Sequence, residues 1–227
     1  MDDTSSKLLT SLRNKKLLAI IRGNNAEACF NTAMTLINAG ITILEVSLTT
    51  TDAFKLISRI HETAAGRVLL GAGTVLTPGQ VHEARDAGAQ FIVTPCLAPS
   101  TDAAFKLGLP SLVGALSPAE VYAAARAGAT AVKLFPASVG GPSYLKALRE
   151  PFPHIEFIPV GGVDAESVTE YLQAGALAVG AGSPLTHDAP RGGSLSELGD
   201  RARKFIGLTQ AASARSHHAE GLRQWTS

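Results

Sequence analysis

The stretch AGATAVKLFP, residues 127–136, contains in ten residues the pattern that decides the fold. It begins with an Ala-Gly pair, in which the glycine suits the position that ends a helix, and continues with a short apolar run typical of a buried strand. The same order recurs three times, at Ala39-Gly40, Ala87-Gly88 and Ala174-Gly175. This internal repeat predicts helices and strands that alternate along the chain.

Working outward from this stretch, eight apolar runs of strand length can be counted. Each is followed by a cluster of turn residues and then by a segment with helical spacing of its apolar residues. The runs are residues 17–22, 42–48, 68–73, 91–95, 111–116, 131–136, 156–162 and 176–182. Strands that alternate with helices form parallel sheets, and eight units in so short a chain favour a closed barrel over an open sheet. We therefore expect an α/β fold, a (β/α)8 TIM barrel.

The two ends of the chain differ from these repeats. Residues 5–14 have the spacing of a short N-terminal helix, which we expect to cover one end of the barrel. Residues 1–206 are expected to form a single barrel domain. Residues 207–227 lack a clear apolar stripe, and we expect a frayed or disordered tail to which no function is assigned.

Charge and composition narrow the class of ligand. The 227 residues include 20 basic and 19 acidic side chains, without a run of like charges, which argues against a nucleic-acid or membrane-surface partner. We expect a small-molecule ligand instead. The two cysteines cannot form a disulfide framework, and no secretory signal or membrane span is evident, so the expected location is the cytoplasm.

Two charged residues occur inside predicted strands. Side chains alternate between the lumen of a barrel and its helix layer, so Val132 and Leu134 facing the helices would direct Lys133 inward. Of the eight lysines, only Lys133 lies within a predicted strand. By the same alternation Glu45 also faces the lumen. An amine in an apolar interior is held in its neutral, nucleophilic form, as attack on a carbonyl requires.

A purely structural interpretation of Glu45 and Lys133 remains open, in which they form a buried ion pair. Such pairs rarely stabilise a protein more than apolar residues do, so two charges in one lumen favour chemistry. Arg22 ends the first predicted strand and would place its guanidinium at the rim, although a solvated strand end explains it equally well.

The last two predicted strands end in glycines, with Gly161-Gly162 in PVGGV and Gly182-Ser183 in GAGSP. Loops after the seventh and eighth strands of barrels often bind phosphate through backbone N–H groups, which requires residues without bulky side chains. We expect a phosphate site there, with glycines serving only tight turns as the alternative. The histidines and cysteines show no metal-ligand spacing, so neither a metal nor a cofactor is expected.

Six motifs, in order, match one known family: LEVSLTT, GAGTVLTP, IVTPCL, AVKLFPA, PVGGV and AVGAGSPL. The chain, from about residue 17 to 185, resembles the 2-keto-3-deoxy-6-phosphogluconate aldolases, some of which also cleave 4-hydroxy-2-oxoglutarate. The stretch FPASVGGPSYLKAL is also similar to aldolases acting on the phosphogalactonate epimer. The resemblance implies a class I aldolase of the Entner-Doudoroff type, a homotrimer acting on a keto-acid phosphate.

The resemblance also implies roles for single residues. Lys133 would form a Schiff base with the keto carbon, and Glu45 would be the general acid and base. The remaining site residues would bind substrate: Thr74 the carboxylate, Pro95 and Phe135 as an apolar wall, and Gly161, Gly162 and Ser183 the phosphate. One position departs from the pattern, because some members place an arginine for the carboxylate where this chain has Thr49. We expect Arg22 to supply the missing cation.

Three hypotheses follow. The first is a metal-independent aldolase that reversibly yields pyruvate and glyceraldehyde 3-phosphate, or glyoxylate from the smaller substrate. The second is a sugar-phosphate epimerase or isomerase, in which Lys133 would act only electrostatically. The third, a non-catalytic sugar-phosphate sensor, is disfavoured because a binding module has no use for an unpaired buried lysine.

Overall fold

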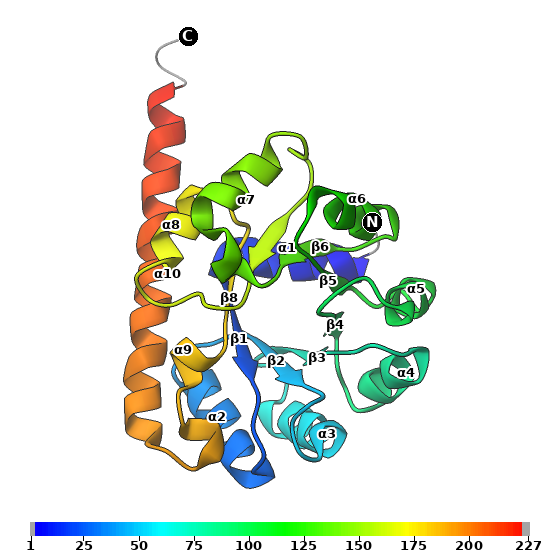
Figure 1. Ribbon diagram of the computed structural model, residues 1–227. Coiled ribbons are helices and arrows are strands. Elements are labelled where there is room, and N and C mark those ends of the chain that lie inside the picture. Colours follow the sequence, from blue (N-terminus) through cyan, green and yellow to red (C-terminus); the bar gives the residue numbers. More distant parts are fainter. Residues whose placement is uncertain (1–2, 224–227) are drawn as a thin grey trace.

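The computed structural model describes the backbone of residues 3–223 and the side chains of residues 3–212. Eight parallel strands alternate with helices around a central axis (Figure 1). The strands are β1 Leu17–Ile21, β2 Ile43–Ser47, β3 Leu69–Gly73, β4 Phe91–Val93, β5 Ser111–Ala115, β6 Ala131–Leu134, β7 Phe157–Pro159 and β8 Val179–Ala181. Neighbouring strands pair in the order β7-β6-β5-β4-β3-β2-β1-β8, and a bridge between Val160 and Gly180 joins the two outer strands. The predicted TIM barrel is confirmed.

The helices begin and end where local chemistry favours it. Their bounds are α1 Asp3–Lys15, α2 Ala26–Asn38, α3 Ala53–Ala64, α4 Pro78–Asp86, α5 Pro99–Lys106, α6 Pro118–Arg126, α7 Gly141–Arg149, α8 Val168–Gln173, α9 Ser183–Thr186 and α10 Leu195–Arg223, with short 3-10 turns η1 Ala137–Val139 and η2 Ala189–Arg191. Thr77 and Ser117 each form a capping box at the start of α4 and α6. The repeated Ala-Gly pairs follow α2, α4, α6 and α8, and each of their glycines has a positive φ.

The predicted alternation along the strands is also confirmed. Val132 and Leu134 of β6 pack in the cluster that joins the strands to the helix layer, whereas Ala131 and Phe135 belong to the separate cluster inside the lumen. On β2, Val46 lies in the helix-facing cluster and Ile43 in the lumen. Lys133 and Glu45 share the parity of the lumen residues, and both are buried.

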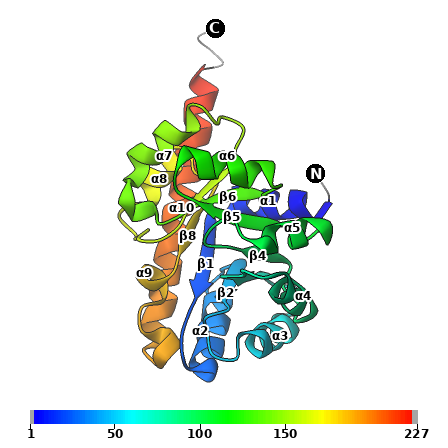
Figure 2. The same ribbon diagram turned by 45° about the vertical axis from the view of Figure 1, so that its right-hand side comes forward.

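Helix α1 closes one end of the barrel. Leu8, Leu9 and Leu12 are buried in the same cluster as lumen residues such as Leu18 and Ile43, which lie at or near the beginning of their strands. Figure 2 shows α1, in dark blue, close to the strands rather than among the outer helices. The expected N-terminal helix is therefore present, and it leaves only the opposite end of the lumen accessible.

Helix α10 runs along one side of the barrel, and its last turns project beyond it in both views (Figures 1 and 2). The domain boundary expected between residues 206 and 207 falls within this helix, which continues to Arg223. In the part of the chain that the structure describes, every helix is either too short or too polar to cross a bilayer.

Candidate active site

A cavity of about 430 Å³ opens at the carboxyl ends of the strands, the end opposite α1. In a TIM barrel this is the end at which catalytic side chains are presented. Seven of the ten predicted site residues line it: Arg22, Glu45, Lys133, Phe135, Gly161, Gly162 and Ser183. Thr49, Thr74 and Pro95 are outside this lining. The structure therefore brings the proposed nucleophile, the proposed base and the glycine-rich loops to one site.

Glu45 is held in the lumen without full compensation of its charge. Its side chain is 1% exposed, and its Oε2 atom has no hydrogen-bond partner among the described residues. Burial raises the pKa of this carboxyl, while the charges of Lys133 and Arg22 counteract the rise only in part. A raised pKa favours the protonated carboxyl, so Glu45 can donate a proton as well as accept one, as an acid and base must.

Lys133 is 5% exposed and comes from β6, across the barrel from Glu45 on β2. Its Nζ atom lies 4.9 Å from the centre of the Phe135 ring. Gly161 packs against the same ring, since an added Cβ at this position would come within 3.1 Å of it. The lysine thus lines the cavity beside an apolar surface, and its charge acts on the Glu45 carboxyl.

Glycines of β3 make the room that the larger lumen side chains need. A Cβ at Gly73 would overlap the Glu45 carboxylate, and one at Gly71 would overlap the ring of Phe91. Strand register accounts for both, because Gly71 pairs with Phe91 on β4, and Gly73 lies two residues beyond Gly71, which pairs with Glu45 on β2. These glycines therefore permit a close approach of side chains rather than a turn.

The three predicted residues outside the cavity lining have identifiable contacts. The Thr49 and Thr74 hydroxyls each share a hydrogen bond of 2.9 Å with the Ser47 hydroxyl. Ser47 lies two residues after Glu45 on β2, so the three hydroxyls form a small cluster beyond Glu45 along this strand. The Pro95 carbonyl lies against Gly114 of β5, where an added Cβ would overlap it. Ser47 was not among the sequence predictions, although its inward parity indicated it.

The far side of the cavity is formed by the loops after β7 and β8. Gly161 and Gly162 have φ values of 91° and 81°, which orient the backbone in a way that other residues rarely adopt. Gly182, Ser183 and Pro184 lie beside them in the cavity wall. Four further polar residues that the sequence analysis did not select also line the cavity: Asn24, Thr186, His187 and Arg191.

Comparison with known proteins agrees with this geometry. Residues 8–192 match the family model described as KDPG and KHG aldolase. The chain belongs to this family. It is 38% identical over 75% of its length to a probable 2-dehydro-3-deoxy-6-phosphogalactonate aldolase of Rhizobium meliloti, covering 82% of that protein. It is 36% identical over 76% of its length to a 2-dehydro-3-deoxy-phosphogluconate aldolase of Pseudomonas aeruginosa, covering 79% of it.

A solved relative bears on the chemistry of the family. The chain resembles the KDPG aldolase of Legionella pneumophila with 31% identity and a TM-score of 0.79, over 86% of this chain and 96% of that one. That structure holds pyruvate captured as a covalent carbinolamine intermediate. A carbinolamine is the adduct of an amine and a carbonyl, so this relative uses the Schiff-base route. The chain is accordingly an aldolase of a class I family.

Proposed function

We propose that the protein reversibly cleaves 2-keto-3-deoxy-6-phosphogluconate to pyruvate and glyceraldehyde 3-phosphate, with Lys133 as the nucleophile and Glu45 as the acid and base. The observation that carries the proposal is the burial of Lys133 and Glu45 in one lumen, on opposite strands of a cavity with one open end. An ion pair built only for stability would not need such a cavity.

The reaction can be written through these two side chains. The Lys133 Nζ attacks the keto carbon of the substrate with its lone electron pair to give a carbinolamine, which loses water to become an iminium. Glu45 then takes the proton of the C4 hydroxyl, the C3–C4 bond breaks, and its electron pair moves into the iminium to form an enamine. The aldehyde phosphate leaves. The enamine carbon takes a proton back from Glu45, and water hydrolyses the resulting iminium to pyruvate and free Lys133.

The remaining site residues are proposed to bind the two anionic ends of the substrate. Arg22 would pair with the carboxylate, since its charge already influences Glu45 from the rim of the lumen. The hydroxyls of Thr74 and Thr49 would add neutral donors on the same side. Substrate binding would have to release them from Ser47, to which both are hydrogen bonded.

The other half of the substrate would lie along the opposite wall. Phe135, which lines the cavity, would provide apolar contact for the carbon chain. Pro95 lies outside the cavity lining in this structure and is proposed to approach the carbon chain from the end of β4 when substrate is bound. Gly161, Gly162 and Ser183 would hold the phosphate through backbone N–H groups and a hydroxyl. The positive φ values of the two glycines support a close approach of the backbone to the ligand.

The experiment that tests the function compares turnover on three substrates: the phosphogluconate compound, its phosphogalactonate epimer and 4-hydroxy-2-oxoglutarate. We expect the highest kcat/KM with the phosphogluconate compound. The epimer is the second candidate, because the Rhizobium meliloti relative named above carries that substrate in its name. Interconversion of sugar phosphates without carbon–carbon cleavage would instead support the epimerase or isomerase hypothesis.

We also propose that the protein is a homotrimer in the cytoplasm. Large apolar side chains are exposed on neighbouring helices, with Phe105 on α5 65% exposed and Tyr122 on α6 58% exposed, and burial of such a surface between copies would be favourable. The free thiols of Cys29 and Cys96 fit a reducing compartment. Sedimentation is expected to give three times the 23.5 kDa chain mass, and a monomer at micromolar concentration would contradict the assembly.

A further inference from the structure

Arg191 is the second arginine in the wall of the active-site cavity, and no role has been assigned to it so far. It ends η2, in the segment between α9 and α10 that follows β8. In the described part of the chain its guanidinium has neither an ion pair nor a hydrogen bond. The Asp188 carboxylate, the acid nearest in sequence, instead packs against the Cα atom of Gly193. A permanent positive charge is therefore available to a ligand in the cavity.

The two arginines of the cavity come from neighbouring parts of the barrel, since Arg22 follows β1 and Arg191 ends η2, after β8. The charge of Arg22 lowers the pKa of Glu45, whereas Arg191 is not among the groups that shift it. Arg191 instead lies with Ser183, Pro184 and His187 on the β8 side of the cavity. The proposed substrate has two anions, a carboxylate beside its reacting keto carbon and a phosphate at its far end. Arg191 is the arginine that shares the β8 side with Ser183, where the phosphate is proposed to bind.

The segment that carries Arg191 is fixed to the barrel at several points. The Cys29 thiol of α2 donates to the Pro190 carbonyl at 3.6 Å, and Gly23 leaves room for both, since a Cβ there would come within 2.7 Å of each. On the other side of the segment, Arg201 of α10 donates to the Leu185 carbonyl at 2.9 Å. Arg191 is thus presented from a packed turn, so binding a ligand would order its side chain but not its backbone.

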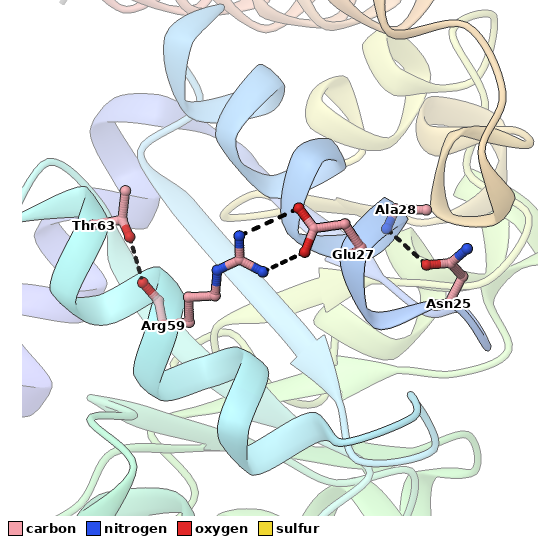
Figure 3. Close-up of polar contacts among 5 residues, drawn as sticks. All are labelled: Asn25, Glu27, Ala28, Arg59 and Thr63. Carbon is pink, nitrogen blue, oxygen red and sulfur yellow. Dashed lines mark hydrogen bonds and ion pairs between the residues drawn. The ribbon is translucent and has the colours of Figure 1, made fainter.

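Helix α2, which supports this turn, is itself tied down at its first turn (Figure 3). Asn25 caps the helix by accepting a 3.0 Å hydrogen bond from the Ala28 N–H. Glu27 forms a two-point ion pair with Arg59 of α3. The Arg59 guanidinium also stacks over the Phe30 ring, 3.6 Å from its centre. A continuous series of contacts therefore runs from α3 through α2 to Pro190, the residue before Arg191.

We propose that Arg191 is a specificity-determining residue that binds the phosphate of the aldehyde half and makes the enzyme prefer phosphorylated 2-keto-3-deoxy sugar acids. The inference rests on the proposed aldolase function. Of the side chains on this wall, Ser183 supplies a neutral hydroxyl, whereas Arg191 supplies a fork of donors that suits phosphate oxygens. Backbone N–H groups of the glycine-rich loops would then orient the phosphate, and Arg191 would neutralise it.

The test measures kcat/KM for 2-keto-3-deoxy-6-phosphogluconate and for its phosphate-free analogue in Arg191→Ala. We expect the phosphorylated substrate to lose about ten- to a hundredfold, the range of one charge-assisted hydrogen bond, and the analogue to lose less than about threefold. Arg191→Lys should recover part of the preference. Arg126→Ala, which removes an exposed arginine at the end of α6, is the matched control and should leave both values unchanged.

Two results would overturn the proposal: an unchanged preference in Arg191→Ala, or equal losses for both substrates, which would indicate a structural role. Binding of inorganic phosphate, followed as a rise in Tm, separates this inference from the proposed function. If wild type cleaves neither compound, the proposed function fails. A phosphate-induced rise in Tm that is lost in Arg191→Ala would still support Arg191 as the phosphate ligand, and a rise that persists in the variant would count against it.

Discussion

The two ends of the barrel lumen are built from opposite kinds of side chain. At the closed end, Leu12 of α1 packs with Leu18, Ile43 and Phe91, and these side chains are almost fully buried. At the open end, Glu45 and Lys133 carry ionisable groups into a cavity. Apolar packing stabilises a fold, while buried ionisable groups usually oppose it. The comparison indicates that one end supplies stability and the other supplies chemistry.

The largest expected effect is the loss of activity in Lys133→Met. Without an amine there is no covalent intermediate, so kcat/KM for aldol cleavage should fall by about 10⁴-fold or more. The fold should persist, because an apolar side chain of similar length replaces a buried charge. Steady-state kinetics and thermal unfolding on the same sample check this prediction. Appreciable cleavage by a folded Lys133→Met protein would contradict the assignment of the chemistry to Lys133 at the open end of the lumen.

Glu45→Gln should have the next largest effect on activity. Removing the proton carrier while keeping the shape typically lowers the rate by about 10²–10⁴-fold. Exchange of the pyruvate methyl protons with solvent, followed by NMR, should slow in parallel. If exchange continued at the wild-type rate, the base would have to be another group.

Glu45→Gln should also change stability, by an amount that depends on pH. Burial raises the pKa of the Glu45 carboxyl in the folded state, so the folded protein holds this proton to a higher pH than the unfolded chain does. The stability that this group contributes is therefore present below its unfolded pKa and lost as pH rises through the folded one. Glu45→Gln should raise Tm at pH 7 relative to wild type, and the difference should shrink toward pH 4. A Tm difference independent of pH would contradict the raised pKa.

A smaller effect is expected from Arg22→Ala at the rim. Loss of one charge-assisted hydrogen bond to the carboxylate costs about 1.5–3 kcal/mol, so kcat/KM should fall by roughly ten- to a hundredfold. Because both the phosphorylated substrate and its analogue carry the carboxylate, both should lose equally, unlike in Arg191→Ala. Adding Thr49→Arg should recover part of the loss. An unchanged kcat/KM would show that Arg22 is a solvated strand end.

The smallest effect on activity is expected at the closed end. Leu12→Ala removes a fully buried side chain and should lower the free energy of unfolding by about 2–5 kcal/mol. The kcat/KM of the protein that remains folded should stay within about twofold of wild type. Denaturant unfolding and kinetics at a temperature well below Tm test this together. A large loss of activity without loss of stability would show that the two ends are coupled.

Much of this arrangement follows from patterns within single segments. The alternation of apolar side chains on β6 was sufficient to predict that Lys133 faces the lumen. The Ala-Gly pairs were sufficient to predict where four helices end, without knowledge of what those helices pack against. Such signals are local, because side-chain direction has a fixed period in a strand and glycine has a fixed advantage at a helix end.

Features that depend on contacts between distant segments were not predictable in this way. The room that Gly73 makes for the Glu45 carboxylate depends on the register of β2 against β3. The position of Arg191 depends on a turn that packs against α2 through Cys29 and Pro190, far apart in the sequence. The continuation of α10 past the expected boundary had no apolar stripe to indicate it.

The most direct test of the central claim is to trap the covalent intermediate on Lys133. Sodium borohydride reduces an iminium to a stable secondary amine, so incubation with pyruvate and borohydride should inactivate the protein irreversibly and add one reduced pyruvyl group to the peptide that contains Lys133. EDTA should not prevent the reaction. Peptide mass spectrometry gives the answer: modification at Lys133 is the predicted result, and modification at another lysine, or no modification of an active enzyme, would contradict it.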